Sequence, residues 1–172
     1  MVYLKFYMNL GIIMDECCTC CFIGHRKVMQ NGMIKERLTE TIEYLITQKG
    51  VDTFLFGSGS EFDALCLNTV TALKGKYQGI KRIYVRAEFP YIDDAYRTYL
   101  LGMYDETYFP ENLLNAGRAV YVERNRVMVD TSLFCVIFFD EKVSYTKRKS
   151  GTKLAFDYML KKNKQVYNLF LE

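Results

Sequence analysis

The chain has 172 residues and a formal net charge of +3, with 23 lysines and arginines against 20 aspartates and glutamates. This length allows one domain with a substantial core. A composition that is 50% hydrophobic and 25% charged excludes a disordered chain, and the mild charge permits an anionic ligand without indicating a surface for duplex nucleic acid.

The N-terminal stretch MVYLKFYMNLGIIM lacks both a basic leader and a small-residue cleavage site, so it does not resemble a signal peptide. It is also too short and too mixed to span a membrane. We therefore expect a cytoplasmic protein with no membrane partner. Because the informative patterns begin at Cys17 and Met14 is an alternative start, residues 1–16 are interpreted as an N-terminal extension and residues 17–172 as a single domain.

Four of the six cysteines lie in the segment CCTCC, which the sequence predicts as the beginning of a strand. Neighbouring strand residues point to opposite faces, so Cys17 and Cys21 should share one face and Cys18 and Cys20 the other. This spacing does not resemble the paired CxxC ligands of a zinc site, and His25 is the only histidine. We expect reduced, mostly buried cysteines and no metal.

Apolar strand-like runs alternate with helical patterns along the whole chain. The run Leu133–Phe139 has no polar member, which is typical of a parallel strand covered on both faces. Because strands alternate with helices, we predict an α/β fold with three layers and a mainly parallel sheet. The predicted strands cover about 19–23, 51–56, 80–87, 106–109, 133–139 and 165–171, and the predicted helices about 31–49, 61–74, 93–103, 116–130 and 151–161.

Three glycine-containing turns fall at the carboxyl ends of predicted strands. Parallel strands place their carboxyl ends at one edge of the sheet, where such folds bind ligands. A small-residue turn at a helix N-terminus offers free N–H groups and positive potential, which suit phosphate. The sequence therefore predicts a nucleotide-like ligand near Gly24-His25-Arg26, Gly57-Ser58-Gly59 and Ser150-Gly151-Thr152.

The familiar phosphate-binding motifs are incomplete. Gly57-x-Gly59 begins like a dinucleotide fingerprint, but Phe62 stands where the third glycine is required, and a P-loop pattern is absent. His25 is either structural, or exposed, or a ligand contact or acid/base group. Arg26 either holds a phosphate or belongs to a solvated basic turn.

The charged residues near these turns can likewise be interpreted in more than one way. Asp63 either compensates the dipole at a helix N-terminus or faces ribose hydroxyls. Glu123, Arg124 and Asn125 either lie on a solvated helix face or supply charge and an amide to the ligand. The Lys-Arg-Lys run at 147–149 is either a solvated loop or a rim that attracts phosphate.

Four segments resemble one protein family. Residues 20–26 (CCFIGHR) resemble the CCFTGHR opening of bacterial proteins in the YpsA-like branch of the SLOG superfamily, and residues 57–63 (GSGSEFD) resemble its GGAxGFD turn. Residues 123–130 (ERNRVMVD) match its ERNxxMVD element, and residues 150–152 (SGT) match its GGT or SGT turn. The departures are Ser58 and Ser60, where the family often has glycine or alanine, and the extra N-terminal segment.

This resemblance implies a Rossmann-like fold that binds nucleotides or nucleotide-derived molecules. Relatives include the Lonely Guy phosphoribohydrolases, which cleave a nucleoside monophosphate to base and ribose 5-phosphate, the Smf proteins, which bind single-stranded DNA, and sensor domains of prokaryotic defence systems. Arg124 matches the catalytic arginine of the hydrolases, but Ala155 stands where their catalytic glutamate should be. A homodimer is a further expectation, because close relatives pair through helices.

We therefore expect a sensor or carrier module for a nucleotide-derived ligand, with no other cofactor indicated. An N-glycosidase acting on nucleoside monophosphates is the first alternative, with Arg124, Glu123 or Asp63 as catalytic candidates. Single-stranded nucleic-acid binding is the second, disfavoured by the small net charge and the lack of an evident aromatic and basic platform. The predicted ligand contacts are Gly24, His25, Arg26, Gly57, Ser58, Gly59, Asp63, Arg124, Asn125, Met128, Ser150, Gly151 and Thr152.

Overall fold

The structure is a computed structural model, and it describes residues 4–6, 13–28, 32–140 and 150–170. Within these ranges, six parallel strands form the central sheet, in the order β6-β5-β4-β3-β7-β8. Parallel strands need long crossovers, and the helices that alternate with them in the sequence supply these. The strands are β3 (Thr19–Gly24), β4 (Thr53–Phe56), β5 (Lys81–Val85), β6 (Glu106–Tyr108), β7 (Phe134–Phe138) and β8 (Gln165–Asn168).

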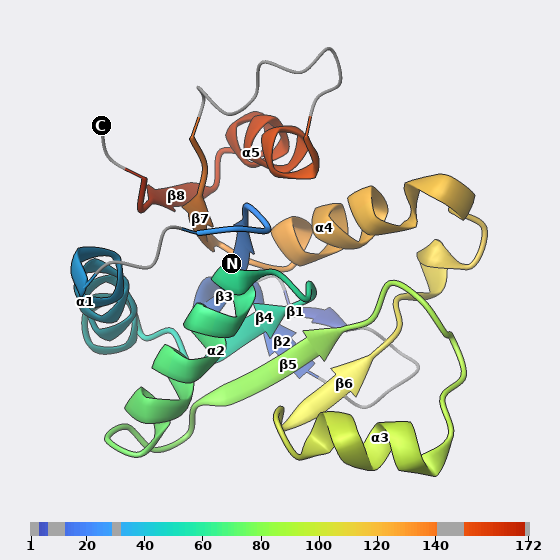
Figure 1. The fold of residues 1–172 in the computed structure, drawn as a ribbon, viewed down its shortest axis with the longest axis horizontal. Coiled ribbons are helices and arrows are strands. Elements are labelled where there is room, and N and C mark those ends of the chain that lie inside the picture. The colour runs from blue at the N-terminus through green and yellow to red at the C-terminus, as the bar shows by residue number, and fades with distance from the viewer. Residues whose placement is uncertain (1–3, 7–12, 29–31, 141–149, 171–172) are drawn as a thin grey trace.

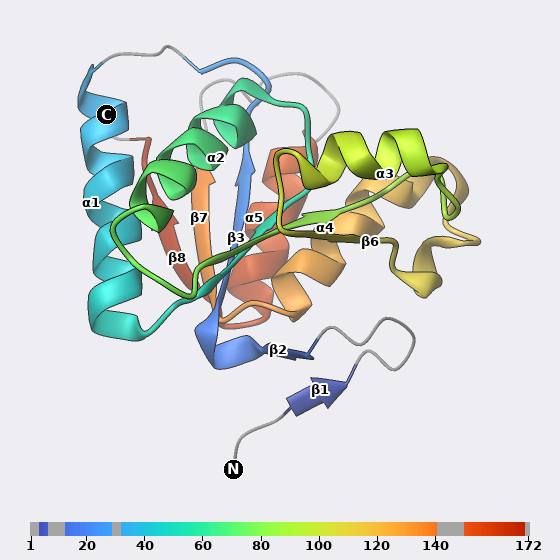
Figure 2. The same cartoon turned by 90° about the horizontal axis from the view of Figure 1, so that it is seen from below.

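Helices cover both faces of this sheet, which confirms the predicted three-layer, Rossmann-like α/β fold (Figures 1 and 2). Strand side chains alternate between the two faces, so Cys20 packs in one core cluster and its neighbour Cys21 in the other. One face is covered by α1 (Gly32–Lys49), α2 (Glu61–Lys74) and α3 (Asp94–Leu101), and the other by α4 (Val120–Asp130) and α5 (Gly151–Lys161).

Several predicted boundaries are corrected. The helix predicted over 116–130 begins with a 3-10 turn at Gly117–Ala119, because the positive φ of Gly117 (53°) interrupts an α-helix. The strand predicted over 80–87 ends at Val85, opposite the last residue of its short partner β6. The last strand ends at Asn168 instead of 171, because the Asn168 side chain turns back to bond both backbone groups of Phe139.

The prediction for the first two cysteines is wrong. Cys17 and Cys18 lie in a 3-10 turn, Glu16–Cys18, because the Asp15 side chain accepts the Cys17 N–H at 3.0 Å and closes a turn ahead of β3. These two cysteines therefore do not share strand faces with Cys20 and Cys21.

The N-terminal residues include a small separate ribbon. Strand β1 (Leu4–Phe6) pairs antiparallel with β2 (Ile13–Asp15). Met14 is buried in the core, and the Glu16 carbonyl accepts the Leu133 N–H at 2.9 Å. Contacts with the main sheet therefore begin just before Cys17. No helix in the described ranges is long and apolar enough to cross a bilayer.

Candidate functional site

The carboxyl ends of β3 and β7 form a topological switch point. The chain leaves β3 for β4 through α1 on one side and leaves β7 for β8 through α5 on the other. Open α/β sheets bind ligands in the crevice beyond such a point. A cavity of about 780 Å³ opens there, which is within the usual size range of small-molecule sites.

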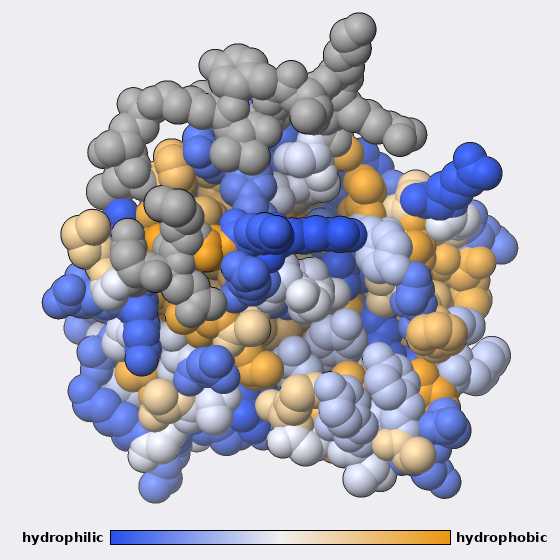
Figure 3. All heavy atoms as spheres, viewed as in Figure 1, coloured by the Kyte–Doolittle hydropathy of each residue, from blue (hydrophilic) through white to orange (hydrophobic). Residues whose placement is uncertain are grey.

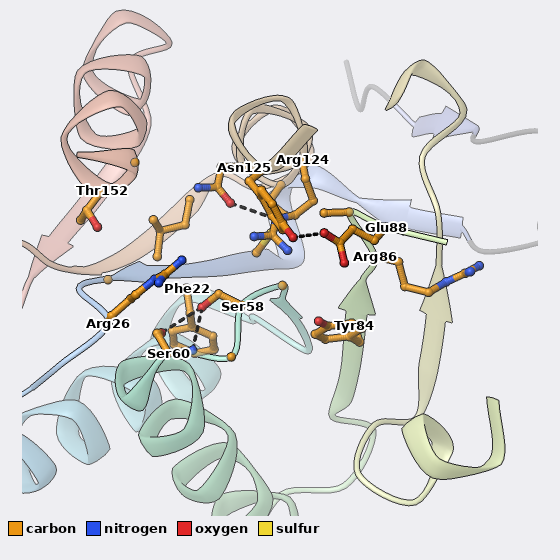
Figure 4. A pocket seen from close by; sticks show the side chains of 18 of the residues that line it. Phe22, Arg26, Ser58, Ser60, Tyr84, Arg86, Glu88, Arg124, Asn125 and Thr152 are labelled. Carbon is orange, nitrogen blue, oxygen red and sulfur yellow. Dashed lines mark hydrogen bonds between the residues drawn. The ribbon is translucent and has the colours of Figure 1, made fainter. Parts of the chain in front are cut away.

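The three predicted turns meet at this cavity. Figure 4 shows Arg26 and Thr152 at one end, Ser58, Arg124 and Asn125 in the middle, and Tyr84 and Glu88 at the other end. Except for Asp63, every predicted ligand contact lines the cavity, namely Gly24, His25, Arg26, Gly57, Ser58, Gly59, Arg124, Asn125, Met128, Ser150, Gly151 and Thr152.

Arg124 is the buried cation of the site, with only 3% of its surface exposed. Its Nε donates to Asn125 Oδ1 at 2.9 Å, and its Nη1 faces the carbonyl oxygen of Val85 at 3.4 Å. No described residue accepts a hydrogen bond from Nη2. Burial lowers the pKa of Arg124 and the charge of Asp63 opposes this, but an arginine stays protonated in proteins. The cavity is therefore lined by a fixed positive charge with a free donor.

Two glycines are required here by close packing. A Cβ on Gly24 would lie 2.3 Å from the Phe62 ring, and a Cβ on Gly57 would lie 2.6 Å from Arg124 Nη1. Phe62 is fully buried, so the residue that replaces the third fingerprint glycine fills the space above Gly24. This packing explains the glycines at positions 24 and 57 although the dinucleotide motif is incomplete.

Asp63 lies behind the Gly57-Ser58-Gly59 turn instead of lining the cavity. Its Oδ2 accepts the N–H groups of Gly57 at 3.1 Å and Ser58 at 2.8 Å. Its Oδ1 is buried without a hydrogen-bond partner in the described chain. Burial raises the pKa of Asp63 to about 6, although the two N–H groups and Arg124 act in the opposite direction. The carboxylate thus already accepts hydrogen bonds from two of the N–H groups that were expected to bind phosphate.

The N-terminus of α2 is closed by further internal bonds. Ser60 caps the helix by accepting the Asp63 N–H at 3.0 Å, and the Glu61 N–H donates to the Arg26 carbonyl at 3.0 Å. The hydroxyls of Ser58 and Ser60, which depart from the family motif, bond to each other at 2.9 Å. The two serines therefore stabilise the turn and leave few donors for a ligand.

The N-terminus of α5 is open by comparison. Ser150 caps it by accepting the Lys153 N–H at 3.1 Å. The N–H groups of Gly151 and Thr152 have no acceptor among the described residues, and both residues line the cavity. Free N–H groups in the first turn, together with the helix dipole, make this end of the cavity suitable for an anion.

His25 links the ends of two strands. Its Nε2 accepts the Asp140 N–H at 3.0 Å, and its backbone N–H donates to the Phe138 carbonyl at 3.2 Å. Because Nε2 is the acceptor, the neutral ring carries its proton on Nδ1. His25 therefore lines the cavity while it also holds β3 against β7.

Three other positions raised by the sequence lie outside the cavity or outside the description. Glu123 does not line the cavity, and its carboxylate pairs with Arg126 at 2.6 Å. Ala155 is buried in the core against the sheet, so no carboxylate stands at that position of α5. The run 147–149 lies outside the described residues.

The sequence interpretation missed the end of the cavity that lies beyond β5. This end does contain aromatic side chains, and Figure 3 shows pale and orange side chains over α3 beside the hydrophilic centre of the same face. The Tyr121 hydroxyl donates to the Glu88 carboxylate and links α4 to the loop after β5. That loop follows a predicted strand, so the rule applied to the other turns would have found it. The missed lining residues include Tyr84, Arg86, Glu88, Phe89, Tyr96 and Tyr121.

The fold was compared with solved structures. The fold is similar to the X-ray structure of DNA processing protein A (DprA) from Streptococcus pneumoniae, with a TM-score of 0.53 and 12% sequence identity. DprA is the Smf protein of the SLOG superfamily, the superfamily that the sequence motifs resemble. At this identity the likeness concerns the fold.

The match covers 87% of this chain and 49% of DprA, so the chain spans about half the length of that protein. Neither models of known protein families nor curated protein sequences give a match.

Proposed function

We propose that this protein binds a nucleotide or a nucleotide-derived ligand in the cavity at the switch point, as a sensor or carrier module of the YpsA-like type. The observation that carries this proposal is the open N-terminus of α5, which faces the same cavity as the buried guanidinium of Arg124. Two independent features that favour anions therefore lie in one enclosure of nucleotide size.

The phosphate is assigned to the end of the cavity where α5 begins. The free N–H groups of Gly151 and Thr152 would donate to its oxygens, and Arg26 reaches towards the cavity from the opposite turn (Figure 4). Arg26 is exposed and makes no ion pair with a described residue. Its guanidinium is thus free to pair with a phosphate in the bidentate manner that arginine favours.

The middle of the cavity suits the sugar. Arg124 offers Nη2, and Asn125 is oriented by its bond to Arg124 Nε. Asp63, first expected to contact ribose, is assigned a different role: it holds the Gly57-Ser58-Gly59 turn from behind. The family resemblance and the likeness to DprA support a nucleotide-related ligand but do not name it.

Thermal unfolding against a ligand panel tests the proposal. The panel contains AMP, GMP, CMP, UMP, NAD, ADP-ribose, ribose 5-phosphate and inorganic phosphate. A ligand at a hundred times its dissociation constant should add about 2.7 kcal/mol to the free energy of unfolding, which moves the midpoint by a few degrees. Arg26→Ala should weaken binding, whereas Lys27→Ala, which removes a neighbouring exposed cation outside the cavity, should not. A flat panel for folded protein would contradict the proposal.

A nucleotide N-glycosidase is the second candidate, because Glu88 supplies the one carboxylate among the described lining residues. In such a reaction Glu88 would take a proton from water and the water oxygen would bond to C1′ as the C1′–N bond breaks. The departing base would then take that proton from the protonated Glu88, directly or through solvent, which restores the carboxylate. Release of free base from a bound nucleoside monophosphate, measured by chromatography and lost in Glu88→Gln, would support this activity. Binding without release would leave the sensor or carrier role.

A further inference from the structure

Phe89 adopts a backbone conformation that is rare for a bulky residue. Its φ is +57°, in the left-handed region that favours glycine. Phe89 is also 62% exposed and lines the cavity. Phenylalanine at this position therefore stabilises the fold neither through its backbone conformation nor through burial of its ring.

The loop that carries Phe89 is held by a buried arginine. Arg86 is 8% exposed, and its Nη1 donates to the carbonyl oxygens of Phe89 at 2.6 Å and Pro90 at 3.3 Å. Its Nε is buried without a partner in the described chain. Residues in sparsely populated backbone regions persist where the surroundings fix them, and they cluster at functional sites. Arg86 thus acts as a clamp that presents Phe89 at the cavity mouth.

Other aromatic residues surround the same end, each on a different element. Tyr84 at the end of β5 packs on Tyr104, with ring centroids 5.0 Å apart. Tyr96 on α3 stacks on Tyr99, with ring planes 14° apart. Tyr121 on α4 is fixed by its bond to Glu88. Apart from Phe89, each ring is thereby backed by another group and would lose little freedom when it contacts a ligand.

The aromatic end and the anion-binding end of the cavity are far enough apart for one elongated ligand to contact both. The strand order places β5 three strands away from β7, which leads to α5. Adjacent strands are about 4.8 Å apart, so the carboxyl ends of β5 and β7 are separated by about 14 Å. A ligand with a charged group at one end and a flat apolar ring at the other would contact both.

From this arrangement we infer that Phe89, together with Tyr84, Tyr96 and Tyr121, forms a subsite for a planar nucleobase. Nucleobases stack on aromatic side chains, and this contact tolerates different bases because each has a π-face. Phe89 is the stacking residue of this subsite and Arg86 its positioning residue. The inference rests on the proposed function and adds that the ligand must carry a ring.

Calorimetric titration of Phe89→Gly tests it, because glycine removes the ring and adopts the positive φ without strain. We expect the dissociation constant of the best-bound nucleoside monophosphate, among AMP, GMP, CMP and UMP, to rise about tenfold. The affinity for ribose 5-phosphate, which lacks the ring, should be unchanged, and the thermal midpoint should stay equal or rise. Tyr91→Ala is the matched control, since Tyr91 is 91% exposed and does not line the cavity.

The possible results distinguish the proposed base subsite from the proposed nucleotide site as a whole. If Phe89→Gly leaves nucleotide affinity intact, or weakens nucleotide and ribose 5-phosphate equally, the base subsite is overturned and the anion site stands. If wild-type protein binds no member of the ligand panel, NAD and ADP-ribose included, the proposed function itself fails. If the variant instead changes the molecular mass in solution, the exposed ring serves self-association and the subsite is again overturned.

Arg86→Met gives a second readout. A methionine has no donor for the carbonyl oxygens of Phe89 and Pro90, so the preference for nucleotide over ribose 5-phosphate should fall in the direction of Phe89→Gly. In the double variant no further fall is expected, because both changes remove one presented ring. A purely structural role of Arg86 would weaken both ligands together and would contradict its assignment as the positioning residue.

Discussion

The N-termini of α2 and α5 have the same kind of serine cap, but they differ in whether the nearby backbone N–H groups are already bonded. Both helices open with a serine cap whose Oγ accepts the N–H three residues on, at 3.0 Å for Ser60 and 3.1 Å for Ser150. Ahead of α2, the Asp63 carboxylate takes the N–H groups of Gly57 and Ser58. At α5, the N–H groups of Gly151 and Thr152 find no acceptor within the described residues.

Two features accompany this difference. The first N–H of α2, that of Glu61, donates to the Arg26 carbonyl, whereas the first N–H of α5, that of Gly151, has no acceptor in the described chain. The third helical residue also differs between the two helices. In α2 this residue is Asp63, an acceptor that folds back under the turn. In α5 it is Lys153, which has no acceptor to offer and pairs with Asp157 at 2.8 Å. A glycine-containing turn before a helix therefore indicates an anion site only where the protein has not already filled its N–H groups.

The largest expected effect concerns the charge of Asp63. Burial raises the pKa of this carboxyl to about 6, above an unfolded value of about 3.9. The folded state then binds the proton more tightly, so this contribution to stability is complete below about pH 4 and is lost as the pH rises through 6. Relative to wild type, Asp63→Asn should gain on the order of 3 kcal/mol between pH 4 and pH 8.

Urea unfolding across this pH range measures the difference between wild type and Asp63→Asn. Asp94→Asn, which removes an exposed carboxylate at the start of α3, controls for the loss of one negative charge. If the wild-type and Asp63→Asn curves run parallel with pH, the closed turn does not hold a carboxylate with a raised pKa.

The second contrast is steric. Gly57→Ala places a Cβ 2.6 Å from Arg124 Nη1 and 2.8 Å from Met128 Sδ, whereas a Cβ on Gly151 meets nothing within 4 Å. Overpacking of this kind costs about 1–3 kcal/mol, so Gly57→Ala should lower the urea midpoint and weaken ligand binding by displacing Arg124. Gly151→Ala should leave the midpoint unchanged or slightly higher. Equal midpoints for the two variants would show that Arg124 is not packed on Gly57.

The sequence predicted where the turns lie but not whether their N–H groups are bonded. Strand alternation predicted the sheet, and the position of each turn after a strand predicted which residues meet at the crevice. The sequence did not show which N–H groups are already bonded, because this depends on where their acceptors, the Asp63 carboxylate and the Arg26 carbonyl, lie in three dimensions. At the aromatic end, the loop after β5 could have been found by the same rule. Tyr96 and Tyr121 could not, because they reach the cavity from helices that the crossovers bring there.

The third contrast compares the two serine caps. Replacing a capping serine by alanine costs about 1 kcal/mol. Ser60→Ala should cost somewhat more than Ser150→Ala, because Ser58 Oγ then loses its acceptor as well. Ser150→Ala should also weaken nucleotide binding, since the open turn frays, and Ser60→Ala should not. Urea midpoints and calorimetric affinities of the same two samples test both statements, and a reversed pattern would place the ligand at α2.

The smallest change in stability should accompany a sharp change in binding. Gly151→Asp adds a negative charge to the first turn of α5, which should stabilise the helix by about 0.3–1 kcal/mol. The same charge would stand beside a bound phosphate. Two like charges 4 Å apart repel by about 1 kcal/mol in water and about 4 kcal/mol near a protein surface, so affinity should fall about tenfold or more. Gly151→Asn has nearly the same shape without the charge, and its affinity should stay close to that of wild type. If Gly151→Asp is more stable than wild type but binds its ligand less tightly, the N–H groups of this turn serve to bind an anion. If Gly151→Asp and Gly151→Asn lose the same affinity, the effect comes from the size of the added side chain.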